Sequence, residues 1–399
     1  MANTILTSTI ITREALRILH QKLNFVGKIN RQYDDRFANS GAKIGSSLLI
    51  RLPNQYTVRT GAVMDVQDTA ENSTTLSVST QKGVDLNFTS VDLTMSLDDF
   101  STRILKPAMS VLAANIEADA MSMRKDINSL ASQSTATASL TFATVLAGQR
   151  RLDDNLCPAD DRVAHLMNQL NVDLVDVLKA LFQDSKQISS QFLEGQMGRA
   201  AGFDFMRSSL WTQFTTGSET ATISINGSSQ TGATLTVTNG SSKTLKAGDV
   251  VTFVGCNAVH PETKSDTGRA MQFVVTADLS SSGTQLSISP SIVTSGATQN
   301  VTASPTTAQA ITKAGAGASG VRDEGLLFHP DAFTFATADL VMPGGVDFAS
   351  RQVMDGISMR IVRQYDINND RFPCRLDVLY GYKTIRQALA CRISANSTV

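Results

Sequence analysis

The first hundred residues switch from a helical to an extended pattern of apolar positions. Residues 12–26 place apolar side chains at the spacing of one helical stripe, at Ala15, Leu16, Leu19, Leu23 and Val26. Thr12 is the expected N-cap of this amphipathic helix. Residues 41–96 then show long, Thr-rich alternating runs that are broken at Pro53 and Gly61. This pattern favours an extended hairpin arm over a compact core.

The longest helix is predicted to begin at Asp98 or Asp99, since both suit the positive end of a helix dipole. From Phe100 to Ile127 the apolar residues keep a period of 3.6 residues. Pro107 lies inside this pattern and should bend the helix. About 30 helical residues span roughly 45 Å, so we expect a strut.

A mixed region follows. Helices are predicted near 141–154, 171–183 and 186–194, and a strand is predicted at Val163–Met167. A turn punctuated by Gly195, Gly198 and Gly202 leads into a strand near residues 203–207.

The middle of the chain has a different character. From Thr215 to Thr312 it is rich in Ser, Thr and Gly, and no charged residue lies between Leu279 and Thr312. Short β-type runs separated by turn residues predict a small barrel or sandwich. These runs lie near residues 221–225, 233–237, 249–254, 271–275 and 284–288. The flanking segments 197–210 and 321–393 read as halves of one unit, so we interpret the β module as an insertion.

The chain leaves this module through a flexible linker, Lys313 to Gly320. Strands are then predicted near 326–328, 359–365 and 375–382, with a helix near Pro330–Leu340. Taken with the earlier elements, the pattern predicts an α+β protein.

Composition narrows the class of protein. A chain of 399 residues predicts two or three units. Charged residues make up 18%, below the usual ~25%, which fits either a Ser/Thr-rich surface or burial against other subunits. The net charge is −1, and the longest basic cluster is Arg150-Arg151. We therefore expect no dedicated nucleic-acid binder; a protein that surrounds nucleic acid would be a container.

The cysteines and the N-terminus point to a reducing compartment. Four scattered cysteines, Cys157, Cys256, Cys374 and Cys391, show no CxxC spacing. The first residues lack a signal-peptide pattern, and no run of 18 apolar residues occurs. We expect no membrane segment.

Possible catalytic motifs are weak. Asp266-Thr-Gly268 matches the aspartic-protease triplet, but the sequence holds no second copy, so a turn is the favoured interpretation. Asp366, Asn368 and Asp370 have the opening spacing of a calcium loop, yet position 6 is Arg371 where glycine is needed.

Other signatures of enzymes are also missing. The glycines of 195–202 do not fit a dinucleotide fingerprint. The four histidines, His20, His165, His260 and His329, have no ligand spacing. We therefore expect a non-enzyme with no catalytic, cofactor-binding or metal-binding residues, and no cofactor.

The order of elements resembles the tailed-phage major capsid protein of the Hong-Kong-ninety-seven-type fold. It is most similar to the P-twenty-two-type coat proteins, which carry an inserted β-barrel. Four segments support this: Gly41-Ala-Lys-Ile-Gly45 with Ile50-Arg-Leu-Pro53, Glu194-Gly with Gly198-Arg-Ala-Ala-Gly-Phe203, Ala247-Gly-Asp-Val-Val-Thr-Phe253, and Val378-Leu-Tyr-Gly381.

The resemblance implies a division of the chain into six parts. These are an N-terminal arm (1–40), an extended loop (41–96), a peripheral domain with the spine helix (97–170), the first part of an apical domain (171–214), an inserted β-barrel (215–315), and an apical and peripheral return (316–399).

The resemblance also implies a function. Hexamers and pentamers of the chain would form an icosahedral head around double-stranded DNA, with scaffolding and portal proteins as partners. The head would assemble in the host bacterial cytoplasm. Two alternatives remain open: a carbohydrate- or receptor-binding β module of a tail or adhesion protein, based on residues 215–312, and an aspartic protease based on Asp266.

Overall fold

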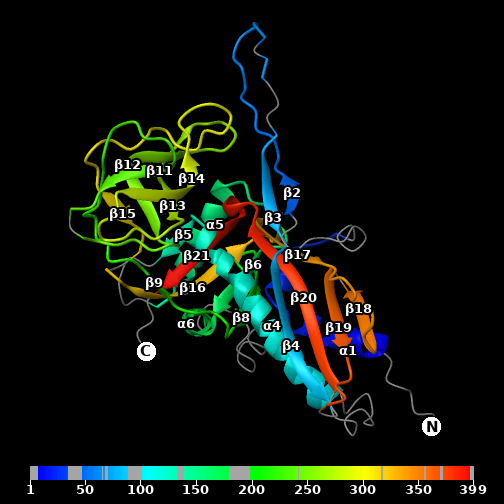
Figure 1. Cartoon of the computed structure of the whole chain (residues 1–399). Helices are drawn as coiled ribbons and strands as arrows, with labels where there is room; N and C mark the ends of the chain where they lie inside the picture. The colour runs from blue at the N-terminus through cyan, green and yellow to red at the C-terminus, as the bar shows by residue number, and fades with distance from the viewer. Residues whose placement is uncertain are drawn as a thin grey trace. The chain divides into compact units, whose positions relative to one another are not determined.

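The computed structural model describes residues 8–34, 47–64, 66–67, 71–88, 101–132, 139–178, 198–240, 242–315, 318–354, 356–368 and 372–395. The chain forms two units (Figure 1). Unit 1 contains Met1–Leu52, Ser73–Ser122 and Phe333–Ile385, and unit 2 contains Pro53–Asn72, Met123–Ala332 and Arg386–Val399. Both units combine helices with sheets, so the predicted α+β class is confirmed.

Unit 1 is built on a six-stranded sheet. Its strands run in the order β1 (Asn30–Asp34), β17 (Phe333–Ala338), β20 (Phe372–Thr384), β19 (Ile357–Arg363) and β18 (Phe348–Met354), and β4 (Thr80–Phe88) also pairs with β20. The long strand β20 is central, because β4 lies along one edge while β19 and then β17 lie along the other.

Two helices and a hairpin complete unit 1. Helix α1 (Ser8–Lys22) packs on α4 (Lys106–Met121) and on β18. A single 3-10 turn, Val26–Lys28, follows α1. The strands β2 (Ser47–Arg51) and β3 (Ser73–Ser77) form a separate antiparallel pair. The predicted Thr12 N-cap is wrong, because α1 begins at Ser8 and Thr12 is buried within the helix.

The spine helix changes type near its proline. Ser101–Leu105 form a π-helical turn, α4 begins at Lys106, and a 3-10 turn over Ser122–Asp126 follows it. Pro107 stands in the first turn of α4, where its missing N–H leaves no intrahelical hydrogen bond unmade. The predicted start at Asp98 or Asp99 lies outside the described residues.

The helix predicted over Pro330–Leu340 is wrong. Only a 3-10 turn forms at Pro330–Ala332, and the strand β17 follows immediately. All six residues of β17 are buried, so both faces of the strand are covered. A strand buried on both faces shows no alternation, and a short apolar run does not distinguish strand from helix.

Unit 2 is built on a seven-stranded sheet. The order is β5 (Leu130–Ser132), β21 (Ala390–Ala395), β16 (Val321–Phe328), β6 (Val163–Met167), β8 (Phe203–Ser208) and β7 (Arg199–Ala200), and β9 (Phe214–Thr215) also pairs with β16. Helices α5 (Phe142–Asp154) and α6 (Asn168–Leu178) pack on this sheet. The predicted strands 163–167 and 203–207 and the helix 141–154 are confirmed. The predicted helix 186–194 lies outside the described residues.

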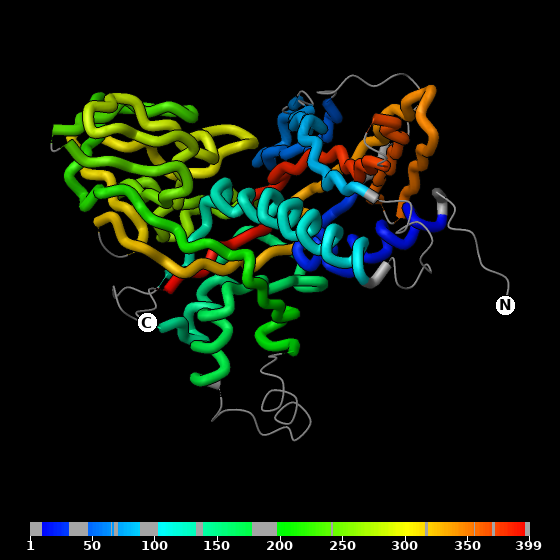
Figure 2. Tube along the Cα trace, turned by 60° about the horizontal axis from the view of Figure 1, so that its bottom comes forward, coloured from blue at the N-terminus to red at the C-terminus, as the bar shows by residue number. Residues whose placement is uncertain are grey.

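The Ser/Thr-rich segment forms its own six-stranded sheet in unit 2 (Figures 1 and 2). The order is β10 (Ser224–Ile225), β11 (Gly232–Thr238), β14 (Gln285–Ile292), β13 (Asp266–Val275), β12 (Val250–Val259) and β15 (Ile311–Lys313). Ser224 bridges Ala310, which joins the first strand to the segment that enters the last. Its interior is a cluster of buried aliphatic and aromatic residues that includes Phe253 and Phe273.

The two ends of this segment lie side by side, as expected of an insertion. Thr215 pairs with Val321 and Phe214 with Arg322, through β9 and β16. The expectation that 197–210 and 321–393 form one unit is only partly right. Residues 333–385 belong to unit 1, whereas β16 and β21 share the sheet of β8.

Within the described part of the chain, no helix is long and apolar enough to cross a membrane.

Candidate functional site

The connection between β2 and β3 carries a group of exposed apolar side chains. Residues 53–72 join the two strands, and the group comprises Tyr56, Val58, Val63, Met64 and Val66. Val58 is 93% exposed and Val63 is 86% exposed. Contiguous exposed apolar groups of this kind mark interaction surfaces in soluble proteins. We call residues 53–72 the hairpin tip.

Side-chain hydrogen bonds link some of the described residues of the hairpin tip. Gln67 forms a reciprocal pair with the backbone of Thr57: its Oε1 accepts the Thr57 N–H at 2.9 Å, and its Nε2 donates to the Thr57 carbonyl at 2.7 Å. Nη1 of Arg59 donates to the carbonyls of Gly61 and, at 3.0 Å, of Val63. A surface ordered in advance loses less entropy when a partner binds.

The strands below the tip are anchored in unit 1. Leu48 and Ile50 of β2 face a small core that contains Leu76, Val78 and residues of β17 and β20, whereas Leu49 is exposed. This alternation is the one expected of a strand with one buried face. The extended arm predicted from residue 41 to 96 thus has a local core at its base, and β4 lies inside the unit 1 sheet.

A buried charge network lies in unit 2 where the inserted segment joins the sheet. Glu324 on β16 is fully buried; it accepts a hydrogen bond from Arg392, and its Oε2 lies 3.7 Å from Nε of Arg124. Arg392 also donates to the carbonyl of Gly248, in the inserted segment, at 2.5 Å. The negative charge of Glu324 thus partly compensates the positive charges of two buried guanidinium groups.

Trp211 lies against this network. Its indole Nε1 donates to Nδ1 of His165 at 2.8 Å, and the Arg124 guanidinium lies 5.1 Å from the ring centroid. Burial lowers the pKa of His165 to about 4, so the imidazole is neutral at pH 7 and accepts this hydrogen bond.

A second link joins the inserted segment to β5. The Gln272 side chain accepts from the Leu130 N–H at 2.8 Å and donates to the Leu130 carbonyl at 3.1 Å. Nδ2 of Asn128 donates to the Gln272 carbonyl at 2.8 Å. These three buried hydrogen bonds fix the position of β13 on the sheet.

The turn predicted at Asp266–Gly268 is wrong, because these residues open the strand β13, whereas Asp366 is followed by a turn. Asp266 is exposed at the start of β13; its Oδ1 accepts from the Gly268 N–H at 2.7 Å, and its Oδ2 accepts from Asn257 at 3.1 Å. Asp366 likewise accepts from the Asn368 N–H at 3.1 Å, between β19 and β20. Asp370, the third residue of the calcium-like spacing, lies outside the described residues.

The other sequence candidates also hold local structure. Gly198 and Gly202 have positive φ values of 64° and 77° in the turn into β8, while Gly195 lies outside the described residues. All four cysteines are free and buried. No group of three or more His, Cys, Asp or Glu residues is placed to hold a metal within the described ranges.

Sequence reasoning missed the buried charges. A signal was present, because charged residues lie within predominantly hydrophobic runs: Glu324 comes just before Leu326–Phe328, and Arg392 lies between Cys391 and Ile393. Their pairing depends on β16 and β21 being neighbours, which no local pattern reveals.

Comparison with known proteins gives one strong match. A family model described as "P22 coat protein - gene protein 5" matches residues 1–390. No curated protein matches the sequence. Similar solved structures include a chain of Mycobacterium phage Che8 (TM-score 0.46, 11% identity, 93% of this chain and 90% of that chain). The capsid of Ralstonia phage GP4 has a TM-score of 0.49 and 7% identity over 95% of this chain and 92% of that chain.

Proposed function

The chain belongs to the P22 coat protein family and is a major capsid protein of a tailed phage, and we propose that it builds an icosahedral head through its hairpin tip. Copies would assemble as hexamers and pentamers around double-stranded DNA, with scaffolding and portal proteins as partners, in the host cytoplasm. The near-neutral net charge of the chain suits a capsid shell that does not bind the enclosed DNA tightly.

Each part of the chain expected from the sequence would have its own role in the shell. The arm (1–40) and the spine helix would support the subunit, and the extended loop (41–96) would reach a neighbour. The segment 215–315 would be an inserted barrel; the bridge between Ser224 and Ala310 supports this, because it joins the two edges of the sheet.

The exposed hairpin tip carries the proposal. Fully burying a Val or Met side chain contributes about 1.5–3 kcal/mol. The five apolar side chains of the tip would therefore contribute several kcal/mol, on that scale, if a neighbour covered even half of their surface. Repeated at every contact of a closed shell, such a term is large enough to drive assembly.

The test replaces apolar tip residues without disturbing the fold. We expect Val58→Asp with Val63→Asp to leave a folded monomer and to abolish shells, because a charge cannot be buried against an apolar neighbour. Val111→Asp is the matched control, since Val111 on α4 is also an exposed valine. Assembly is measured by sedimentation and negative-stain electron microscopy. Closed shells at the unaltered yield from the double variant would refute the role of the tip.

A deletion of residues 41–96 would be a poorer test. It would remove β4, which pairs with β20 over nine residues, from the unit 1 sheet. Removing residues 54–71 alone spares both hairpin strands and is the deletion to compare with the point variants.

A further inference from the structure

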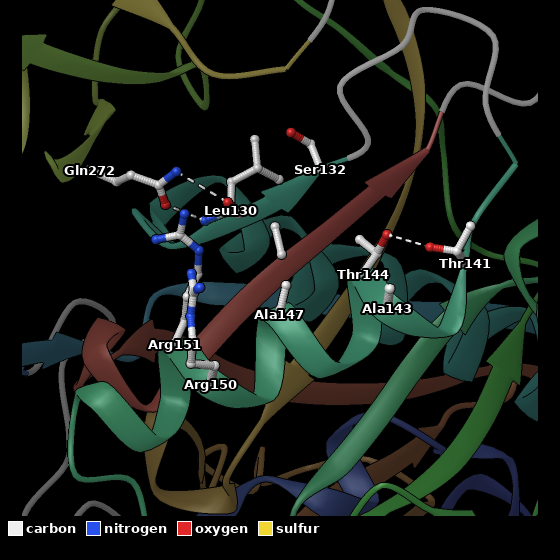
Figure 3. A pocket seen from close by; sticks show the side chains of 10 residues that line it. Leu130, Ser132, Thr141, Ala143, Thr144, Ala147, Arg150, Arg151 and Gln272 are labelled. Atoms are coloured by element: carbon white, nitrogen blue, oxygen red, sulfur yellow. Dashed lines mark hydrogen bonds between the residues drawn. The ribbon is translucent and has the colours of Figure 1, made fainter. Parts of the chain in front are cut away.

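A pocket of about 310 Å³ lies between α5, β5 and the side chain of Gln272 in unit 2 (Figure 3). Small side chains, Ala143 and Ala147, form its wall along α5, and Arg150 and Arg151 stand at the end of that helix. In Figure 3 both guanidinium groups extend from the helix toward Gln272. The pocket is therefore shallow and apolar on one side and cationic at one end.

Arg151 differs from the other poorly exposed arginines of unit 2. Arg162 donates to Asp153 and two carbonyls, Arg322 donates to the Ala314 carbonyl, and Arg392 binds Glu324. Among the described residues, no hydrogen bond or ion pair involves the Arg151 side chain, although its backbone carbonyl accepts from the Asn155 N–H. Its Nε, like those of Arg322 and Arg392, is buried without a partner. A buried donor without a partner is unfavourable, and more so when it is charged.

The local charge is unbalanced. Asp154, the last residue of α5, already has a partner, because its Oδ2 lies 2.6 Å from Nη1 of Arg269. Nε of Arg150 lies 3.9 Å from the same oxygen, beyond hydrogen-bonding distance. Burial has the largest effect on the pKa of Arg151 and lowers it; Cys391 and Asp154 raise this pKa, while the charges of Arg150 and Arg269 lower it. Arg150 and Arg269 thus share one carboxylate, and the Arg151 guanidinium has no ion pair among the described residues.

We propose that this pocket binds a carboxylate of an acidic protein segment, with Arg151 as the principal ligand and Arg150 as the second. The planar guanidinium fork matches a carboxylate through two parallel hydrogen bonds. The concave, partly apolar wall suits an Asp or Glu side chain. A DNA backbone needs a row of cations on an open surface, and only this adjacent pair lines the pocket.

The test uses the unassembled full-length protein and a fluorescent tetra-aspartate peptide, with binding followed by anisotropy at low salt. We expect salt-sensitive binding that Arg151→Gln weakens at least about tenfold, the scale of one charge-assisted hydrogen bond. Arg207→Gln, at an exposed arginine of β8, is the matched control and should bind like the unaltered protein.

A second variant covers the case in which Arg151→Gln misfolds. Ala147→Glu places a carboxylate one helical turn before Arg151, the favourable orientation for an i,i+4 ion pair. The introduced carboxylate should pair with Arg151 and so abolish peptide binding, while the helix stays intact. Fluorescence of the single tryptophan, Trp211, reports that unit 2 remains folded.

Three results would overturn the proposal. The unaltered protein could fail to bind the peptide at about 1 mM, the weak end of specific affinities. Binding could survive both Arg151→Gln and Ala147→Glu. A short DNA duplex could bind through Arg151 while the peptide does not, which would make the site one for phosphate.

The yield of assembled shells shows which molecule supplies the carboxylate. If a second copy supplies it, Arg151→Gln should lower the yield of shells formed by this chain alone. If another protein supplies it, only assembly with that protein should suffer. The hairpin-tip variants should retain peptide binding, so failure of the tip proposal and failure of this one give different results.

Discussion

Removing the charge of Glu324 should destabilise unit 2 strongly. Glu324 is fully buried, accepts from Arg392 and lies 3.7 Å from Arg124. It also raises the pKa of Arg322, against the larger lowering caused by burial. Glu324→Gln keeps the shape of the side chain but leaves these guanidinium groups without their shared carboxylate. Breaking a buried ion pair in this way costs about 3–5 kcal/mol.

Trp211 provides the assay for this loss. It is the single tryptophan of the chain, is 5% exposed, and lies beside Arg124. Its fluorescence during urea unfolding therefore reports on unit 2. With a slope of about 1–3 kcal/mol per molar urea, a loss of about 3–5 kcal/mol should lower the midpoint by about 1–5 M.

Two further variants sharpen the test. Glu262→Gln, at an exposed carboxylate of the inserted segment, should leave the midpoint unchanged. Adding Arg392→Met to Glu324→Gln should recover part of the loss, because one uncompensated charge is removed. A midpoint for Glu324→Gln within about 0.3 M of the unaltered protein would refute the assignment of Glu324 as the group that offsets these arginines.

Two other predictions concern unit 1. Burial raises the pKa of Glu117 to about 7 although it accepts the N–H groups of Phe25 and Val26 at 2.9 and 3.0 Å. The folded state then binds the extra proton between pH 4.5 and 7, so the contribution of Glu117 to stability is fully present below pH 4.5 and falls by about 3 kcal/mol as the pH rises to 7. Glu117→Gln should flatten this slope in urea titrations by circular dichroism, and an unchanged slope would contradict it. Gly381→Ala should prevent soluble expression, because its Cβ would lie 2.2 Å from the Ser77 carbonyl oxygen, whereas Gly344→Ala meets nothing and should express normally; soluble Gly381→Ala would show that β3 moves aside.

Local patterns in the sequence identified several elements but missed others, such as the strand β18. Helix α5, with its stripe of buried Val145 and Leu152, was predicted at nearly its observed bounds. The strand β17 was predicted as helix, because its burial on both faces removes the alternation that identifies a strand.

Local sequence patterns could not predict which distant segments lie next to each other. Ion pairs such as Glu324 with Arg392 exist because strands 68 residues apart are neighbours. The exposed tip was expected as part of an extended arm, but which of its side chains stay uncovered depends on the Gln67 and Arg59 clamps.

The central claim is that the hairpin tip of one coat subunit lies on another. The four native cysteines are buried, so Val58→Cys adds a single exposed thiol to which a photoactivatable cross-linker can be attached. Irradiated shells should yield cross-linked dimers and higher species on a denaturing gel, and irradiated monomers at equal concentration should yield none. Shells in which the linker joins residue 58 only to its own chain would contradict the claim.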